Sequence, residues 1–346
     1  MLVEIEKELL QRALSKKRTI VFPEAGFSER IRKASLEIVK LGLANVVLVG
    51  SIDNMLKTIS QNDLNNFTIV DPEKTPLISE LANKVYEIRK AKGLTLDEAY
   101  KLLQDPIYFA NAYTACDYAD GIVCGAEVPT ASTLRPALQI IKSKNGLVSS
   151  YFLFSGENSV TDNAFLMGDC GVIEYPTAEQ ECTIAENMLN EFNLLGLNAP
   201  KLAFLSYSTM GSAKSESTLK VSEAFNLFSQ KHPNIDAVGE VQFDASIKQS
   251  VAKVKIPNIK FTKPANIFVM PNIDAGNICY KMVQYFGALK AIGPITSGFN
   301  KPVNDLSRGC TVDDIVLLTA ITCIQCKWLC DDYSKWKCKI LILRLR

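Results

Sequence analysis

Histidine is almost missing from this chain: its 346 residues include a single one, His232 in "KHPN". A serine or cysteine nucleophile that depends on a histidine base therefore has almost no candidate partner. An excess of one charge is missing too, because 38 basic residues stand against 37 acidic ones. No basic face is left to attract nucleic acid. No segment approaches the roughly 20 apolar residues of a membrane-spanning helix, so we expect neither nucleic acid nor membrane as partners.

Nucleotide-binding loops of known pattern are missing as well. The sequence has no G-x-x-x-x-G-K-[ST] loop and no G-x-G-x-x-G that follows a strand. The run "DLSRG" at residues 305–309 differs from the nucleophile elbow G-x-S-x-G at its first position. None of these three signatures indicates the chemistry of the chain.

Apolar residues, in contrast, make up 47% of the chain, enough for a large core. Because single cores stop growing near roughly 250–300 residues, we expect two domains. The start, "MLVEIEKELLQRAL", predicts an acidic amphipathic helix and not a signal peptide. Ten cysteines are scattered singly through apolar stretches such as "GIVCG" and "AITCI". We expect them to be reduced, buried thiols of a cytoplasmic protein.

Short apolar runs alternate with amphipathic stretches, which is typical of βαβ units and a mostly parallel sheet. Strands are predicted in the first half at residues 18–22, 45–50, 67–70 and 121–125. In the second half they are predicted at 147–154, 164–169, 201–206, 237–241 and 266–270. A closing helix begins at about Thr311. The expected fold class is therefore α/β, with two doubly wound, mostly parallel sheets.

The domain boundaries are predicted from the order of these elements, because no repeat or composition break marks them. We place the first domain at residues 1–145 and the second at 146–299. The closing segment, residues 300–346, is predicted to return to the first domain. Boundaries inferred in this way are good to a few residues.

Three arginines are candidates to bind an oxyanion, because a planar guanidinium donates two parallel hydrogen bonds and stays charged. Arg308 lies in the Ser-Arg-Gly run of "NDLSRGC". Arg135 begins the predicted helix "STLRPALQIIKS", with Pro136 at a tolerated early position. Arg89 lies near the end of a helix that Gly93 should stop. A solvated surface charge is the alternative for each arginine. It is least favoured for Arg308, since a loop of Asn, Asp, Ser and Gly around it is costly unless it binds something.

Two residues beside this run have competing interpretations. Thr311-x-x-Asp314 fits a capping box, which is sufficient to explain the aspartate. Spacing alone does not favour Asp314 over Asp313 or Asp305 as a base. Cys310 could accept an acyl group, but no histidine is positioned to lower its pKa, and the only evident cation is the arginine of the run.

Two other patterns favour a structural interpretation. The small-residue loop "STMGSAKS" at residues 208–215 follows a strand and could hold a phosphate at a helix amino end, yet an ordinary βα turn is favoured. Cys323, Cys326 and Cys330 share one helical face, and Cys338 follows in the tail. Core packing is favoured there over a zinc site, which would usually have a second knuckle or histidines at set spacing.

Taken in order, these segments resemble the phosphate acetyltransferase/butyryltransferase family. The resemblance extends to about Gln325 and rests on the ordered set "RKAKG", "ADGIVCGA", "STLRPALQIIK", "AFLSYSTMGSAKS", "GEVQFDASI", "NIFVMPNIDAGNICYK", "GPITSGFNKPVNDLSRGC" and "AITCIQ". It implies the reaction acetyl-CoA + phosphate ⇌ CoA + acetyl phosphate, a step of acetate metabolism. It also implies two α/β domains with an inter-domain cleft, related to the isocitrate/isopropylmalate dehydrogenase fold, and a homodimer.

Site roles follow from the resemblance position by position. The family's essential serine and arginine fall on Ser307 and Arg308, and its catalytic aspartate falls on Asp314. The residues assigned to CoA and phosphate binding are Arg89, Arg135 and Cys310, the first two matching the family's CoA-associated arginines. The serine then needs no histidine, because CoA brings its own thiol to attack the acetyl carbonyl. No metal or redox cofactor is implied, and the partners are CoA, acetyl phosphate and phosphate.

The base assignment carries a condition. Proton transfer from a thiol of pKa near 8.5 to an aspartate near 3.9 is uphill by ~4.6 units, about 6 kcal/mol. Asp314 can act as base only if the site raises its pKa or if Arg308 lowers that of the thiol. We therefore expect Asp314 to be desolvated at the floor of the cleft.

Three alternatives have different requirements. The same chemistry on a longer acyl chain, as in phosphate butyryltransferase, differs only in pocket volume, where one methylene is worth ~1–3 kcal/mol; the full set of motifs favours acetyl. A decarboxylating dehydrogenase would need a magnesium-binding aspartate set and an adenosine-binding loop, and neither pattern is present. A non-catalytic CoA-sensing module would not need Ser307, Arg308 and Asp314 intact.

Overall fold

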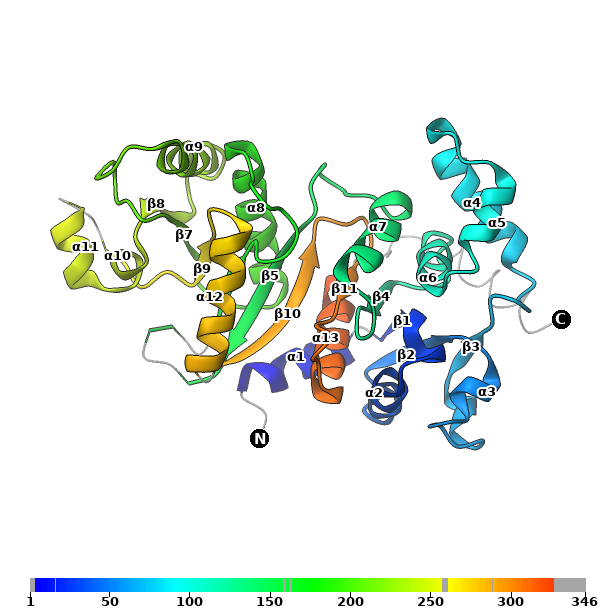
Figure 1. The fold of residues 1–346 in the computed structure, drawn as a ribbon. Helices are drawn as coiled ribbons and strands as arrows, with labels where there is room; N and C mark the ends of the chain where they lie inside the picture. Colours follow the sequence, from blue (N-terminus) through cyan, green and yellow to red (C-terminus); the bar gives the residue numbers. More distant parts are fainter. Residues whose placement is uncertain are drawn as a thin grey trace.

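Two sheets organise the chain in the computed structural model, which describes residues 4–15, 17–157, 160–161, 164–256, 261–287 and 289–326 (Figure 1). All neighbours in the first sheet are parallel. Its strand order is β11 (Val303–Asp305), β4 (Gly121–Cys124), β1 (Arg18–Phe22), β2 (Ala44–Val49) and β3 (Thr68–Val70).

The second sheet is mixed. Its strand order is β10 (Lys290–Ser297), β5 (Ser149–Ser155), β6 (Ala164–Gly168), β9 (Ile267–Val269), β7 (Lys201–Leu205) and β8 (Asp236–Val241). The strands β10, β5 and β6 are antiparallel neighbours, and the remaining pairs are parallel. Strand β10 therefore forms an edge of this sheet.

Helices connect and cover the strands (Figure 1). In the first half of the chain they are α1 (Glu4–Leu14), α2 (Glu29–Lys40), α3 (Ile52–Met55), α4 (Ile78–Arg89), α5 (Leu96–Leu102), α6 (Pro106–Ala115) and α7 (Thr130–Ile140). In the second half they are α8 (Ala178–Leu194), α9 (Glu216–Lys231), α10 (Phe243–Ile247), α11 (Gln249–Lys255), α12 (Ile273–Phe286) and α13 (Val312–Gln325). Of the helices in these described ranges, none is both long and apolar enough to cross a bilayer.

The predicted α/β class with two mostly parallel sheets is confirmed, and each of the nine predicted strands is present within a few residues of its expected place. Strands β10 and β11 were not predicted. The strands up to Cys124 lie in the first sheet together with β11, and those from Ser149 to Ser297 lie in the second.

The predicted domain boundaries at residues 145 and 300 stay a prediction, because one packed core spans both sheets. Helix α13 packs on α1, α2 and β4, but also on β10. Helix α1 reaches the second sheet, where the Ser155 hydroxyl donates a hydrogen bond to Glu6 Oε1 at 3.1 Å. Both terminal helices therefore contribute to the junction between the sheets.

The sequence placed the start of helix α7 too late. Arg135 and Pro136 were expected in or near its first turn, but the helix begins at Thr130 and both residues lie in its interior. The extended residue before it, Pro129, has φ −65° and ψ 150° and takes the N-cap position. A proline tolerated inside a helix misled the prediction, because proline usually marks the first turn.

The closing helix is present where the sequence predicts it, and two of the four C-terminal cysteines lie within the described residues. Helix α13 begins after Thr311, as predicted, and its ten buried residues include Cys323. Cys326, at its C-cap, is buried as well, which agrees with core packing. Cys330 and Cys338 lie outside the described residues.

Candidate active site

The Ser-Arg-Gly turn lies directly between strand β11 and helix α13. Leu306 before it is buried and donates its N–H to the Cys124 carbonyl at 2.7 Å, continuing the pairing of β11 with β4. The Cys310 N–H donates to the Ser307 carbonyl at 2.9 Å, which closes the turn. Ser307 and Arg308 are exposed. The turn therefore presents both side chains to solvent from a base that is anchored in the core.

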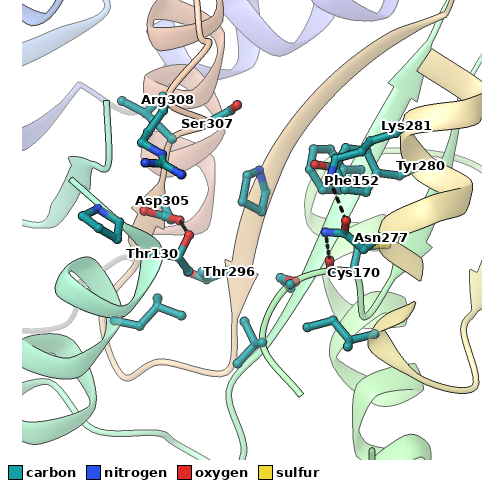
Figure 2. A pocket seen from close by; sticks show the side chains of 18 of the residues that line it. Thr130, Phe152, Cys170, Asn277, Tyr280, Lys281, Thr296, Asp305, Ser307 and Arg308 are labelled. Carbon is teal, nitrogen blue, oxygen red and sulfur yellow. Dashed lines mark hydrogen bonds between the residues drawn. The ribbon is translucent and has the colours of Figure 1, made fainter. Parts of the chain in front are cut away.

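A cavity of about 360 Å³ lies beside this turn, between the two sheets. One wall comes from the first sheet and α7, with Thr130, Asp305 and Arg308. The opposite wall comes from β5 and α12, with Phe152 and Lys281 (Figure 2). Two cationic side chains thus line the same cavity from opposite walls, and such a site suits a small anion.

Helix α12 supplies its wall through a short hydrogen-bonded chain. The Lys281 ammonium donates to Asn277 Oδ1 at 2.6 Å, and Asn277 Nδ2 donates to the Cys170 carbonyl at 3.2 Å (Figure 2). The Tyr280 ring stacks on Phe152, with centroids 4.0 Å apart and an angle of 17° between the rings. These contacts fix the wall opposite Arg308. Sequence reasoning missed it, because nothing in the sequence links α12 to the Ser-Arg-Gly turn.

A smaller cavity of about 80 Å³ adjoins the first one. The two cavities share four lining residues, Phe152, Tyr280, Leu306 and Ser307. Asp314 and Cys310 line only the smaller cavity, and Arg308 lines only the larger one. The structure therefore brings Ser307, Arg308, Cys310 and Asp314 together, with Ser307 at the border between the cavities.

Asp314 forms the capping box that its spacing predicts. Its Oδ2 accepts hydrogen bonds from the N–H and the hydroxyl of Thr311, both at 2.8 Å, and its own N–H donates to Thr311 Oγ1 at 3.2 Å. The residue is half-buried. The expectation of a fully desolvated carboxylate is therefore not met in this structure, since the first turn of α13 opens toward the cavity and keeps contact with solvent.

Cys310 is buried beneath the turn, and burial raises the pKa of its thiol to about 11. The sulfur also accepts a hydrogen bond from Arg30 Nη1 at 3.7 Å. At neutral pH the residue is a neutral thiol, whereas the thiolate is the nucleophilic form. This environment disfavours Cys310 as the acyl acceptor and leaves it as part of the cavity lining.

Asp305 is a buried carboxyl group in the larger cavity. It ends strand β11 and accepts a hydrogen bond from the Thr130 hydroxyl at 2.6 Å. Gly125 makes room for it: the backbone there has φ +100°, and a Cβ would lie 2.1 Å from Asp305 Oδ1. Burial raises the pKa of Asp305 to about 6. Spacing had left Asp305 open as an alternative base to Asp314.

The raised pKa of Asp305 predicts a pH-dependent stability. The folded state binds this proton more tightly than the unfolded chain, where the pKa is about 3.9. The stability from this group is therefore full below about pH 4 and is lost as the pH rises through about 6. Relative to Asp305→Asn, wild type should lose about 2 kcal/mol between pH 4 and pH 7.

Urea denaturation of both proteins across that pH range measures this difference. Exposed Asp313 offers the matched control, because Asp313→Asn removes an aspartate without removing a buried one. A difference between wild type and Asp305→Asn that stays constant with pH would contradict the raised pKa.

Arg89 and Arg135 lie near each other, but they line neither cavity. Arg89 ends α4 and Gly93 follows with φ +85°, as the predicted helix stop requires. Burial raises the pKa of Tyr108, and the positive charges of Arg135 and Arg89 oppose this shift with a smaller effect. The structure thus places both arginines within electrostatic range of Tyr108.

The loop at residues 208–215 is occupied by a carboxylate of the chain itself. Buried Glu240 accepts hydrogen bonds from the Ser208 hydroxyl at 2.9 Å and from the Gly211 N–H at 2.7 Å. Ser215 caps helix α9 together with Thr218. An internal anion takes the donors that a phosphate would need, in agreement with an ordinary βα turn.

A polar cavity between two β-sheets, with a cation on each wall, is typical of α/β proteins that bind small anions. The family model described as "Phosphate acetyl/butaryl transferase" matches residues 4–323. The chain therefore belongs to the phosphate acetyl/butyryl transferase family.

Individual proteins agree with this assignment. The chain is 41% identical over 327 residues to a phosphate acetyltransferase of Acetivibrio thermocellus, covering 93% of this chain and 98% of the relative. It is 37% identical to the crystal structure of a phosphotransacetylase from Streptococcus pyogenes, with a TM-score of 0.88 and coverage of 94% and 99%. The predictions of this family, of its fold and of a phosphate acetyltransferase activity are confirmed.

A more distant likeness concerns the fold alone. A chain described as a 4-hydroxythreonine-4-phosphate dehydrogenase from Salmonella typhimurium is 13% identical, with a TM-score of 0.51 and coverage of 89% of this chain and 99% of that chain. The predicted relation to a dehydrogenase-like fold agrees with this match.

Proposed function

We propose that the chain transfers the acetyl group in a ternary complex, by direct attack of the CoA thiolate on acetyl phosphate at the Ser-Arg-Gly turn. The carbon–sulfur bond forms first and gives a tetrahedral intermediate, in which the bond from the acetyl carbon to the phosphate oxygen then breaks. Phosphate leaves, and Asp314 takes the proton of the thiol. The observation that carries this proposal is the position of Ser307 and Arg308 at two adjoining cavities, with Asp314 lining the smaller one.

Each residue has a role in this scheme. Arg308 binds the phosphate and offsets the charge of the tetrahedral intermediate and the leaving group, as preorganised donors do. Lys281 offers a second positive charge from the opposite wall of the cavity. Ser307 donates a hydrogen bond to the same developing charge. The acetyl methyl group fits the smaller cavity, whose lining includes Phe152 and Leu318. The scheme needs no metal or redox cofactor.

Arsenolysis tests the reaction. Arsenate in place of phosphate gives an unstable acetyl arsenate, so acetyl-CoA should be broken down continuously and free CoA thiol should accumulate without NAD. Butyryl-CoA is the matched substrate, and a preference for it would assign the longer acyl chain. Absence of thiol release from either thioester would contradict the proposed function.

We assign Arg89 and Arg135 to the phosphates of CoA. Loss of one charge-assisted contact costs about 1.5–3 kcal/mol, which corresponds to an increase of KM of ~10-fold or more. Arg89→Gln and Arg135→Gln should each raise the KM for CoA by this factor and leave that for acetyl phosphate within about twofold. Steady-state kinetics with each substrate varied in turn checks the assignment. An increase confined to the KM for acetyl phosphate would place these arginines elsewhere.

We also propose that the chain forms a homodimer through helix α12. Its outer side exposes Ile278, Met282, Tyr285 and Phe286, with 58%, 52%, 80% and 86% of their surface accessible. An apolar patch of this kind is typical of an interaction surface, and a second copy of the chain is its proposed occupant. A monomer mass in sedimentation equilibrium would contradict the dimer.

We also place the protein in the cytoplasm, because free thiols at every described cysteine suit a reducing compartment.

A further inference from the structure

Arg30 connects three segments around the active site with one guanidinium group. Its Nη1 donates to the backbone carbonyls of Arg308 at 2.8 Å and Cys310 at 2.9 Å. Its Nη2 donates to the Ala126 carbonyl at 2.6 Å and to Glu127 Oε1 at 3.1 Å. Arg30 itself is the second residue of helix α2. A helix, the loop after strand β4 and the Ser-Arg-Gly turn are therefore joined at one side chain.

The turn has few other restraints on its exposed side. The two carbonyls that Arg30 binds flank Gly309, whose N–H makes only a long bond to Ser307 Oγ, at 3.4 Å. The turn is otherwise held by the hydrogen bond from the Cys310 N–H to the Ser307 carbonyl, and at its ends by the pairing of Leu306 and by the cap of α13. The carbonyl of Arg308 is held directly by Arg30, so the guanidinium of Arg30 fixes the backbone from which the Arg308 side chain extends.

The loop after β4, which Arg30 joins to the turn, is itself held by several hydrogen bonds. The loop after β4 is bound from its amide side by buried Glu24, whose carboxylate accepts the N–H groups of residues 126, 127 and 128 at 2.8, 2.9 and 3.1 Å. The Ser28 hydroxyl adds a hydrogen bond to Glu127 Oε1 at 2.8 Å. The same loop continues into Thr130 and lines the larger cavity. Arg30 thus fixes the turn relative to a preformed part of the cavity wall.

We propose that Arg30 is a positioning residue for the acetyl transfer, one that holds the Ser-Arg-Gly turn in the geometry needed for the reaction. This inference rests on the proposed function of Ser307 and Arg308. Arg30 lines neither cavity, so it acts through the turn and not on the substrate. Lysine cannot replace it, because a single ammonium cannot bind carbonyls of two segments in the fixed fork of a guanidinium.

Arg30→Gln should lower kcat by about 100-fold and leave both KM values within about twofold, since a displacement near 1 Å can cost that factor in rate. Arg30→Lys keeps the charge and should still fall about tenfold or more below wild type. Arg32 provides the matched control on the same helix. It is buried and donates to the Ala25 carbonyl at 2.7 Å and to Thr58 Oγ1 at 2.9 Å. Arg32→Gln should lower Tm with kcat within about twofold of wild type.

A double-mutant cycle separates positioning from a merely structural effect. In an Arg308→Ala background, Arg30→Gln should lower kcat by less than about threefold, because the side chain it positions is gone. A further loss near 100-fold in that background would overturn the proposal. So would wild-type kcat in Arg30→Gln and Arg30→Lys, each measured well below its own Tm.

The outcomes also separate this inference from the proposed function. If Arg308→Ala keeps full turnover, the proposed function of the turn fails, and the positioning role of Arg30 fails with it. If Arg308→Ala loses turnover while the Arg30 variants keep theirs, only the positioning role is wrong. If the glutamine variant does not fold, Arg30→Lys alone decides between these results, because it keeps the positive charge beside Glu127.

Discussion

Arg308→Ala should lower kcat for acetyl transfer by about 10²–10³-fold, the factor typical of removing one preorganised donor from an oxyanion site. The KM for acetyl phosphate should rise as well, because the guanidinium is proposed to bind the phosphate in the ground state. Stability should barely change. Arg308 is exposed, and no residue in the described part of the chain accepts a hydrogen bond from its side chain. Surface substitutions of this kind cost within about 0.5 kcal/mol.

Stopped assays in both directions, together with Tm for each variant, test this expectation. Arg308→Lys is the matched variant: it keeps the charge but not the bidentate fork, so its kcat should lie between wild type and Arg308→Ala. Near-normal turnover of Arg308→Ala would remove the central cation from the mechanism. A stable acetylated enzyme, formed from radiolabelled acetyl phosphate without CoA, would contradict direct attack by the thiol.

The strands that the sequence predicted are those in which local pattern and tertiary structure agree. In the runs 18–22 and 201–205 the residues from Ile20 to Phe22 and from Leu202 to Leu205 are apolar and buried, and both strands pair only with parallel neighbours. Strand β10 was missed because Gly293 and Pro294 interrupt its pattern. Its pairing with β5 shifts register between Ile292 and Ile295, and it lies at the edge of its sheet. Edges and bulges are the places where a strand tolerates proline.

Strand β11 was missed for a different reason. Its three residues, "VND", end in Asn and Asp, which are rare in strands. Tertiary contacts keep them there: Asn304 is buried and its amide donates to Thr322 Oγ1 at 2.8 Å and to Gln325 Oε1 at 2.7 Å. The short strand places the Ser-Arg-Gly turn at the carboxyl edge of a parallel sheet, where ligands of α/β proteins usually bind. Local propensity does not contain this information.

The candidate site was predictable only on one side. The motif "NDLSRGC" and the resemblance to a family identified Ser307, Arg308 and Asp314, and the structure brings them together. The opposite wall, with Lys281 and Tyr280, depends on how the two sheets pack, which no local pattern encodes. Arg30 had a weak signal, since "PEAGFSER" follows directly after strand β1, where the sheet's carboxyl edge lies.

The candidate site takes residues from both sheets, and this arrangement affects the proposed role of Asp314 as base. The cation and hydroxyl of the turn come from the first sheet, and the apolar lining of the smaller cavity comes partly from β5 and α12. Binding of CoA between the walls would remove water from the half-buried carboxylate of Asp314. Substrate binding would therefore complete the desolvation that the proposed role of Asp314 as base requires.

Asp314→Asn should therefore lower kcat by about 10²–10⁴-fold, the usual contribution of a general base. Both KM values should stay within about threefold, since the residue is proposed to act on the thiol proton and not on binding. The amide oxygen of asparagine can still accept the two hydrogen bonds from Thr311, so helix α13 keeps its cap.

Thr311→Ala is the matched control for this prediction, because it removes the capping hydroxyl and leaves the carboxylate. It should cost about 1 kcal/mol of unfolding free energy and lower kcat by less than about tenfold. Comparable kcat losses in both variants would make Asp314 a helix cap alone. A change of equal size confined to the KM of Asp314→Asn would reject its role as base. The thiol of CoA has a pKa near 8.5, so free thiolate accumulates as the pH rises toward that value. The residual kcat of Asp314→Asn should therefore rise with pH. Wild-type kcat should depend less on pH, because Asp314 takes the proton of the thiol.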